Sequence, residues 1–180
     1  MLLALPASWA WASEVPPQYQ AVLFLKALAY DQNLKARAPK TVNVVVLHRP
    51  GAPDSEAAST ALIAAMIAAG KQSGVGGTPL QVTALPFTNA AALESSLVSL
   101  GAHALFLCPG LTDAVPAITA VARRRGVLSG GGSEAYARAG VSIGLGLKDQ
   151  KAVLFVNLAA SRAEGAKLDS SLLRVAQVIN

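Results

Sequence analysis

The spacing of apolar residues changes early in the chain. Over residues 19–37 they recur at helical spacing, with Leu25 and Leu28 on one stripe, and the pattern predicts a helix that Pro39 ends. Residues 41–47 are instead a continuous run of mostly β-branched side chains, which is typical of a strand buried on both faces. We therefore expect a helix that leads into an inner strand of a sheet.

Apolar runs and amphipathic stretches alternate through the next part of the chain. We expect further strands over 80–85, over 104–108 and from 127, and helices over 54–69, 89–100, 112–124 and 133–138. Strands that alternate with helices build parallel βαβ units. Most of the sheet should accordingly be parallel, with helices on its faces.

The C-terminal part follows a different pattern. Residues 141–147 and 152–158 are β-prone apolar runs, and the polar segment 148–151 turns the chain between them. Such a pair predicts an antiparallel hairpin added to the sheet, and a helix over 168–179 should end the chain. The expected fold class is α/β: a mostly parallel sheet flanked by helices, with a C-terminal antiparallel hairpin.

Composition favours one folded domain. The chain has 180 residues, of which 53% are hydrophobic and 14% charged, which is enough for one core and too little for two. No internal repeat or low-complexity linker divides it. We expect residues 13–180 to form a single α/β domain.

Residues 1–12 resemble the end of a secretory signal peptide. Their apolar start is followed by the small-x-small pattern Ala10-Trp11-Ala12, which predicts cleavage before Ser13. A cationic first segment is missing, so the alternative is a short apolar start that packs on the domain. No other run approaches the about 18 to 20 apolar residues of a membrane span. We expect an exported, periplasmic protein.

The net charge of +5 does not point to a nucleic-acid partner. Basic residues are scattered, and aromatic residues make up only 5% of the chain, whereas a nucleic-acid binder needs a basic face with stacking aromatics. The densest basic cluster, residues 123–125, has a simpler interpretation as the end of a helix, where cations complement the helix dipole.

Cysteine and histidine usage gives no catalytic or metal site. The single cysteine, Cys108, cannot form an intramolecular disulfide and ends an apolar run, so we interpret it as a buried small side chain. His48 follows its strand while His103 precedes its own, so the two should lie at opposite ends of the sheet. A triad of His48, Asp54 and Ser55 is conceivable at one loop, but nothing resembles a nucleophile elbow. We expect no enzyme, no metal and no cofactor.

The best candidate binding site is the rim at the carboxyl ends of the parallel strands, where open α/β sheets bind ligands. It should hold the polar and glycine-containing segments that follow three strands, namely His48 and Arg49, Pro109 and Gly110, and Ser129 and Gly130. Glycines there let backbone N–H groups approach a ligand. The alternative is a glycine-rich turn without a ligand.

The end of the chain carries a signature. A glycine-containing strand, a strand that ends in Val156-Asn157-Leu158, an Ala-Ser-Arg-Ala segment with Gly165 and a Ser-Ser-Leu-Leu-Arg segment follow one another. This order resembles the C-terminal signature of the YfiR-type periplasmic regulator family. Asn157 and Arg162 belong to it: the first is expected to cap the next turn, and the second to pair with an acidic residue or reach a partner.

The resemblance implies a function. The founding member of the family restrains an inner-membrane diguanylate cyclase. Members have a fold related to periplasmic binding domains and are commonly dimeric. We therefore expect a homodimeric, non-enzymatic regulator that binds the periplasmic domain of a membrane signalling protein through the first helix, with Leu25 and Leu28, and the rim around Arg49 and Gly130. The alternative is a small solute-binding component of a transporter or sensor system, with a small ligand at the rim.

The chain also departs from the family. Paired cysteines, which members often carry, are missing, and the aromatic and proline-containing end of the first helix is replaced by Tyr30-Asp-Gln-Asn33. If that region shapes partner contact, the partner differs from that of the founding member.

Overall fold

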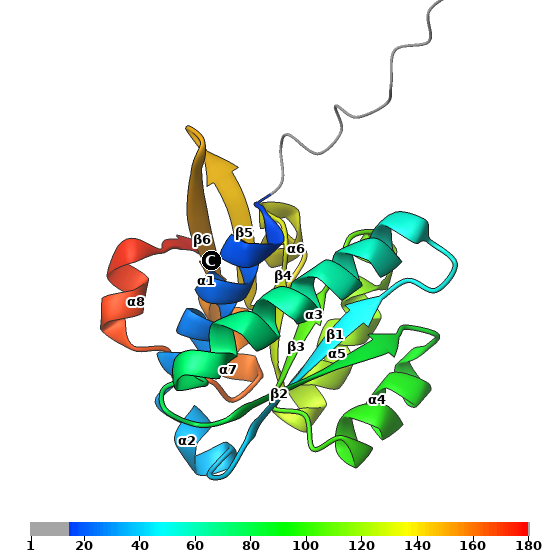
Figure 1. Ribbon diagram of the computed structural model, residues 1–180, viewed down its shortest axis with the longest axis horizontal. Helices are drawn as coiled ribbons and strands as arrows, with labels where there is room; N and C mark the ends of the chain where they lie inside the picture. The colour runs from blue at the N-terminus through cyan, green and yellow to red at the C-terminus, as the bar shows by residue number, and fades with distance from the viewer. Residues whose placement is uncertain (1–14, 180) are drawn as a thin grey trace, which may run out of the picture.

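The computed structural model describes residues 15–179, which form one seven-stranded sheet in the order β2-β1-β3-β4-β5-β6-β7 (Figure 1). Neighbouring strands pair in parallel except β5 and β6, which form the antiparallel hairpin. The strands are β1 (Val42–His48), β2 (Leu80–Pro86), β3 (Ala104–Leu107), β4 (Leu128–Gly131), β5 (Ile143–Lys148), β6 (Lys151–Asn157) and β7 (Gln177–Ile179). The predicted α/β class and the C-terminal hairpin are confirmed.

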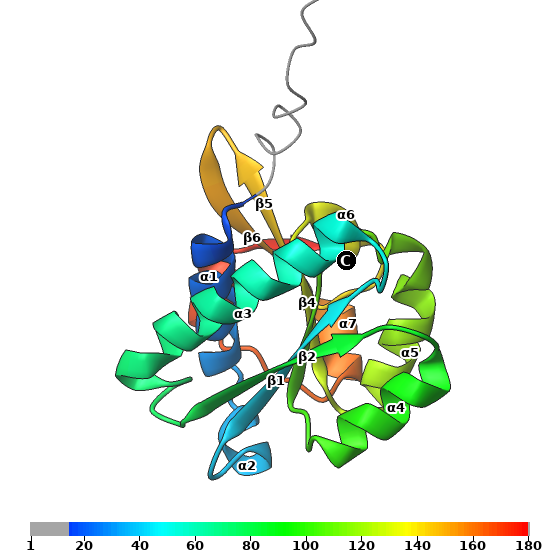
Figure 2. The ribbon, with the colours of Figure 1, turned by 45° about the vertical axis from the view of Figure 1, so that its right-hand side comes forward.

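Helices cover both faces of the sheet (Figures 1 and 2). α1 (Pro17–Ala29) and α3 (Pro53–Ser73) pack on one face and share one apolar core with it, while α4 (Ala90–Ser99) and α5 (Val115–Arg125) share a second core with the other face. The shorter helices are α2 (Leu34–Arg37), η1 (Thr112–Ala114), α6 (Glu134–Arg138), α7 (Leu158–Ala163) and α8 (Ser170–Val175). Among residues 15–179, no helix is long and apolar enough to cross a membrane.

The position of strand β3 between two layers of helices explains why its sequence is apolar throughout. Ala104 and Phe106 belong to the core beneath α1 and α3, whereas Leu105 and Leu107 belong to the core beneath α4 and α5. Side chains alternate between the faces of a strand, so every side chain of a strand covered on both sides is buried, which favours apolar residues. The expected burial on both faces is confirmed for β1 in the same way, since Val44 and Val46 belong to the first core and Val45 and Leu47 to the second.

Helix α1 lies unusually close to strand β4. The rings of Phe24 and Phe106 meet edge to face with centroids 5.1 Å apart, a preferred aromatic geometry. A Cβ atom at Gly130 would lie 2.3 Å from Cε2 of Phe24, so glycine is required there. Gly130 therefore serves the contact between helix and sheet.

The hairpin turn explains the polar break between the last two long strands. Lys148 pairs with Lys151 across the turn, and the two central residues, Asp149 and Gln150, have φ values of 49° and 60°. Positive φ at both positions defines the type I′ turn, whose twist matches that of the flanking strands.

Two expected helices end early. The helix predicted over 19–37 splits into α1 and α2, because Asp31 leaves the helix to form a β-bridge with Leu168. The helix predicted over 168–179 ends at Val175, and the chain then forms β7, parallel to β6. In both places a contact between distant segments replaces local helix propensity. The predicted signal remnant at 1–12 lies outside the described residues.

Candidate functional site: a cavity at the strand ends

A cavity of about 540 Å³ lies beyond the carboxyl ends of β3 and β4, on the face of the sheet that α1 and α3 cover. Its walls come from the start of α1, the first half of α3, the ends of two strands and the start of α6. The lining residues are Pro16, Pro17, Gln20, Ala57, Ala58, Ala61, Leu62, Phe106, Cys108, Pro109, Gly110, Thr112, Gly132, Ser133 and Tyr136. We call this space the strand-end cavity.

Small side chains on α3 leave the space open. Ala57, Ala58 and Ala61 face the cavity from successive turns of the helix, while Phe106 lies in the sheet below. The two sides of a helix–sheet contact normally fill such space with larger side chains, since protein interiors are close-packed. Here three methyl groups stand where larger residues would close the cavity.

The wall formed by Tyr136 is held in place by hydrogen bonds. Its hydroxyl donates to the carbonyl oxygen of Cys108 at 2.7 Å and accepts from the backbone N–H of Leu111 at 3.1 Å. Ser133 caps α6 and accepts from the backbone N–H of Tyr136 at 3.3 Å. The ring is thereby fixed against the loop that follows β3.

The start of α1 forms the opposite wall. The carboxamide of Gln20 donates from Nε2 to the carbonyl oxygen of Val15 at 2.5 Å. Its other atom, Oε1, lies beside Gly132, where an added Cβ would come within 3.0 Å of it. Gln20 thus brings a hydrogen-bond acceptor to the cavity wall, next to backbone without a side chain.

Cys108 takes the place that its sequence context predicts. The side chain is buried, and burial raises the pKa of the thiol to about 12. The thiolate is the nucleophilic form of cysteine, so this thiol stays neutral and unreactive at physiological pH. Its interpretation as a buried small side chain is confirmed.

The rim residues at β1 lie beside the cavity. Arg49 pairs with Asp113 and donates to the carbonyl oxygen of Gly110, so it ties the loop after β1 to the loop after β3. Its backbone N–H donates to the hydroxyl of Ser55 at 2.9 Å. Nδ1 of His48 is buried and has no hydrogen-bond partner among residues 15–179. Pro109 and Gly110 line the cavity, as the rim prediction requires.

His103 lies at the other end of the sheet, as predicted. Its Nδ1 accepts from the backbone N–H of Asn43 at 3.1 Å, and Nε2 lies 3.0 Å from the carbonyl oxygen of Arg37. Burial lowers its pKa. Within the described residues, no group of three or more His, Cys, Asp or Glu side chains could hold a metal ion.

Four predicted site residues lie inside the fold. Leu25 and Leu28 are buried in the core, because the apolar stripe of α1 faces the sheet. Ser129 and Gly130 are buried too, because β4 continues through Gly131 and takes them away from the rim. Their expected exposure to a partner or ligand is wrong.

The two candidates from the C-terminal signature differ from each other. Asn157 caps α7: its side-chain oxygen accepts from the backbone N–H of Ala160 at 2.9 Å, and Nδ2 donates to the carbonyl oxygen of Ala137 at 3.0 Å. The expected capping role is confirmed. Arg162 is exposed on α7 and forms no ion pair with the acidic residues that the structure describes.

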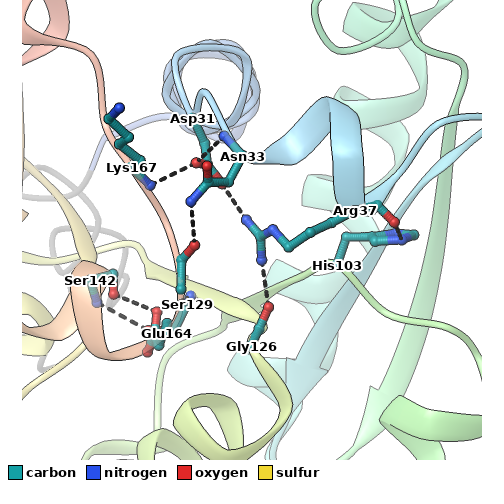
Figure 3. Close-up of polar contacts among 10 residues, drawn as sticks. Asp31, Asn33, Arg37, His103, Gly126, Ser129, Ser142, Glu164 and Lys167 are labelled. Carbon is teal, nitrogen blue, oxygen red and sulfur yellow. Dashed lines mark hydrogen bonds and ion pairs between the residues drawn. The ribbon is translucent and has the colours of Figure 1, made fainter.

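A second polar cluster, which we call the amino-end anchor, consists of Asp31, Arg37, Ser129, Ser142 and Glu164 (Figure 3). Asp31 pairs with Arg37 and accepts from two backbone N–H groups, those of Asn33 at 3.0 Å and Lys167 at 2.8 Å. Arg37 also donates to the carbonyl oxygen of Gly126. The end of α1 is thereby joined to the start of β4 and to the C-terminal segment.

Glu164 is the other buried acid of the anchor. It accepts from the backbone N–H of Ser129 at 2.8 Å, from the Ser129 hydroxyl at 2.6 Å and from the Ser142 hydroxyl. Burial raises its pKa to about 7, against the opposing effect of these serine hydrogen bonds. The carboxyl group joins α7 to two strands at their amino ends.

Sequence reasoning missed the anchor and most of the cavity. A glutamate near the end of a short helix and an aspartate at the end of another are ordinary surface patterns, and alanine in a helix signals nothing by itself. The signal that could have found Asp31 is the unusual Tyr30-Asp-Gln-Asn33 segment, which interrupts the helix at the point where the anchor forms.

The comparisons with known proteins identify the family. The YfiR/HmsC-like family matches residues 18–177, and the chain belongs to it. This range includes nearly all of the described fold, the anchor, and every lining residue of the cavity except Pro16 and Pro17. No curated protein matches the chain by sequence.

Solved structures share the fold. An ABC domain from Streptococcus pneumonia in complex with L-Trp is 16% identical with a TM-score of 0.64, over 91% of this chain and 62% of that one. A conserved domain protein from Vibrio cholerae is 14% identical with a TM-score of 0.64, over 93% and 61%. The ligand-free, open CD0873 of Clostridium difficile, a substrate binding protein with adhesive properties, is 14% identical with a TM-score of 0.57, over 83% and 58%.

These likenesses show the fold alone. The chain spans about three fifths of the length of the solved structures that it matches. The expected relation to binding domains of the substrate-binding class is confirmed at the level of architecture.

Proposed function

We propose that this protein is a periplasmic, non-enzymatic regulator that binds the periplasmic domain of a membrane signalling protein, such as a diguanylate cyclase or a sensor kinase, and restrains its output. The observation that carries the proposal is the family match over residues 18–177. Restraint would act by population shift, because a protein that binds the inactive form of its partner more tightly holds the partner in that form.

The proposed contact surface combines the rim with the outer side of α1. Tyr19 and Val22 are 61% and 44% exposed there, with Lys26 one turn further along. Exposed aromatic side chains such as Tyr19 are enriched at protein interfaces, and a cation such as Lys26 is typical of the polar rim around them. Leu25 and Leu28 would support this surface from the core beneath, and Arg49 would extend it across the rim. Arg162 offers a separate exposed cation on α7.

Capture of the partner tests the proposal. The protein, purified from its native host with crosslinked membrane components, should bring down a membrane protein that has a periplasmic domain and a cytoplasmic signalling domain. Deleting the gene for the regulator should then raise the output of that partner. Recovery of a permease instead would contradict the proposal.

Protein purified from the same host without crosslinking tests two further parts of the proposal. Intact mass should show cleavage before Ser13, as expected of an exported protein, and light scattering should show a homodimer. An uncleaved chain in the cytosol would contradict the periplasmic location.

A second candidate function is a small solute-binding component of a transporter or sensor system. The strand-end cavity favours it, since open α/β sheets bind ligands beyond the carboxyl ends of their strands. Of the proteins with similar folds, one is an ABC domain in complex with L-Trp and another is described as a substrate binding protein. A gene beside a permease would favour this candidate, and one beside a diguanylate cyclase or kinase the first.

A further inference from the structure

We propose that the strand-end cavity is a binding site for an uncharged, largely apolar small molecule. The proposal deepens both candidate functions, since the ligand would be the signal that a regulator senses or the solute that a binding protein carries. It concerns the isolated protein, however, and can be tested without any partner.

The size and place of the cavity fit a small molecule. Its volume of about 540 Å³ falls within the range of roughly 300 to 1,000 Å³ that small-molecule pockets occupy. It lies beyond β3 and β4, where the loops of an open α/β sheet leave a crevice. α3 and α1 form its walls above the sheet, so a ligand would lie between helices and sheet with one side open to solvent.

The lining chemistry excludes a charged ligand. Among the described residues that line the cavity, none has an ionisable acid or base except the thiol of Cys108 and the phenol of Tyr136. The thiol is neutral because burial raises its pKa. A charged group taken from water into such a site would lose hydration without gaining a partner of opposite charge, which is costly. The nearest rim cation, Arg49, is already paired with Asp113.

Polar contacts in the cavity are few. Pro16, Pro17 and Pro109 have no backbone N–H to donate. The Tyr136 hydroxyl already serves Cys108 and Leu111. Gln20 Oε1 and the hydroxyls of Thr112 and Ser133 remain as polar groups on the wall. The ligand should therefore be mostly apolar, with one or two polar atoms that fix its orientation.

A matched pair of fluorescent probes tests the charge requirement. N-phenylnaphthylamine is uncharged and apolar, and anilinonaphthalene sulfonate has the same rings with a sulfonate added. In a fluorescence titration of the purified protein, we expect N-phenylnaphthylamine to saturate at one molecule per chain. The sulfonate should bind at least about tenfold more weakly. Equal binding of the two probes, or no saturable binding, would overturn the proposal.

A matched pair of variants tests the location. Ala61→Trp places a large side chain into the cavity, whereas Ala64→Trp makes the same change at an exposed position of α3 outside it. We expect Ala61→Trp to weaken N-phenylnaphthylamine binding at least about tenfold and Ala64→Trp to leave it unchanged. Ala57→Trp repeats the test from the neighbouring turn, and thermal melting confirms that each variant is folded. Equal affinities in folded Ala61→Trp and Ala64→Trp would place the probe elsewhere.

The result is separable from the proposed functions. A cavity that binds the uncharged probe would stand even if no membrane signalling protein is captured. If the protein captures its partner but binds no probe, the proposed regulatory function stands and the proposed ligand site is overturned.

Discussion

At the amino end of the sheet, buried charged and polar groups join segments that are far apart in the sequence. At the carboxyl end lies a cavity whose lining, within residues 15–179, includes no charged residue. In the anchor, Asp31 and Glu164 accept hydrogen bonds from the backbone or side chains of four other segments. At the cavity, the helices and loops leave a space of about 540 Å³ unfilled. One end holds the fold together, and the other end leaves room for a ligand.

The difference between the two ends follows from the free energy needed to bury a charge at one end and to leave space unfilled at the other. A buried carboxylate is tolerated only where several donors replace its lost hydration, so the anchor fixes the chain in one arrangement. An unfilled cavity forfeits the contacts that close packing would give, and such a loss is expected where a site has another use. Changes at the two ends should accordingly affect different properties.

The largest expected effect is loss of stability on opening the anchor. Asp31→Ala leaves Arg37 and two backbone N–H groups without their acceptor, so we expect the free energy of unfolding to fall by about 3 to 5 kcal/mol. Asp113→Ala removes the acid of an ion pair at the rim, where the Asp113 side chain is 75% exposed, and should cost less than about 1 kcal/mol. Urea unfolding measures both. Similar losses in the two variants would remove the proposed distinction between the ends.

A smaller effect should appear in the dependence of stability on pH. Because burial raises the pKa of Glu164 from 4.5 to about 7, the folded state holds this proton more tightly than the unfolded state, which is worth roughly 3 kcal/mol at most. That stability is fully present below about pH 4.5 and is lost as the pH rises through 7. Urea unfolding between pH 5 and 8 should show this decline.

The control for this pH effect is Glu164→Gln. Its stability should lack the decline, because the amide does not titrate, and the difference between the variant and the native protein isolates Glu164. His103 has a lowered pKa and acts in the opposite direction, since its stabilising effect is lost as the pH falls, but it is present in both proteins. The same slope in both proteins would contradict a raised pKa of Glu164.

The smallest effect is expected at the cavity itself. Cys108→Ala removes a buried thiol and should lower the free energy of unfolding by roughly 1 kcal/mol. Partner binding should remain, because the neutral thiol has no chemical role. Thermal melting and the partner capture described above measure the two properties. Loss of capture in a variant with unchanged melting would instead indicate a reactive thiol.

The sequence predicts the alternating strands and helices of this fold well. Continuous apolar runs locate β1 and β3, and Asn89 and Ser133 mark the starts of α4 and α6 as expected, because each signal is local. The hairpin also follows from local pattern. The parts of the rim that follow β1 and β3 could be placed for the same reason, since the ends of these strands are visible in the sequence.

The rest depends on contacts between distant segments. Asp31 ends α1 because Lys167 and Leu168 lie beside it, and β7 forms because β6 has a free edge. A glycine run usually marks a turn, so the sequence predicts Gly130 at the rim, but here the glycine leaves room for the ring of Phe24. The alanines of α3 line a cavity only because α1 and β3 fail to fill the space opposite them. None of these partners can be read from the neighbouring residues.

The central claim is that the carboxyl end of the sheet serves binding while the amino end serves the fold. The most direct test measures partner affinity and thermal melting on the same variant, Arg49→Glu, with Arg124→Glu as control, since Arg124 is also exposed and paired with one acid, Glu94, at 2.7 Å. We expect Arg49→Glu to weaken binding of the captured partner about tenfold, with melting unchanged in both variants because exposed ion pairs contribute little to stability. Unchanged affinity in a folded Arg49→Glu, or an equal loss in Arg124→Glu, would contradict the account.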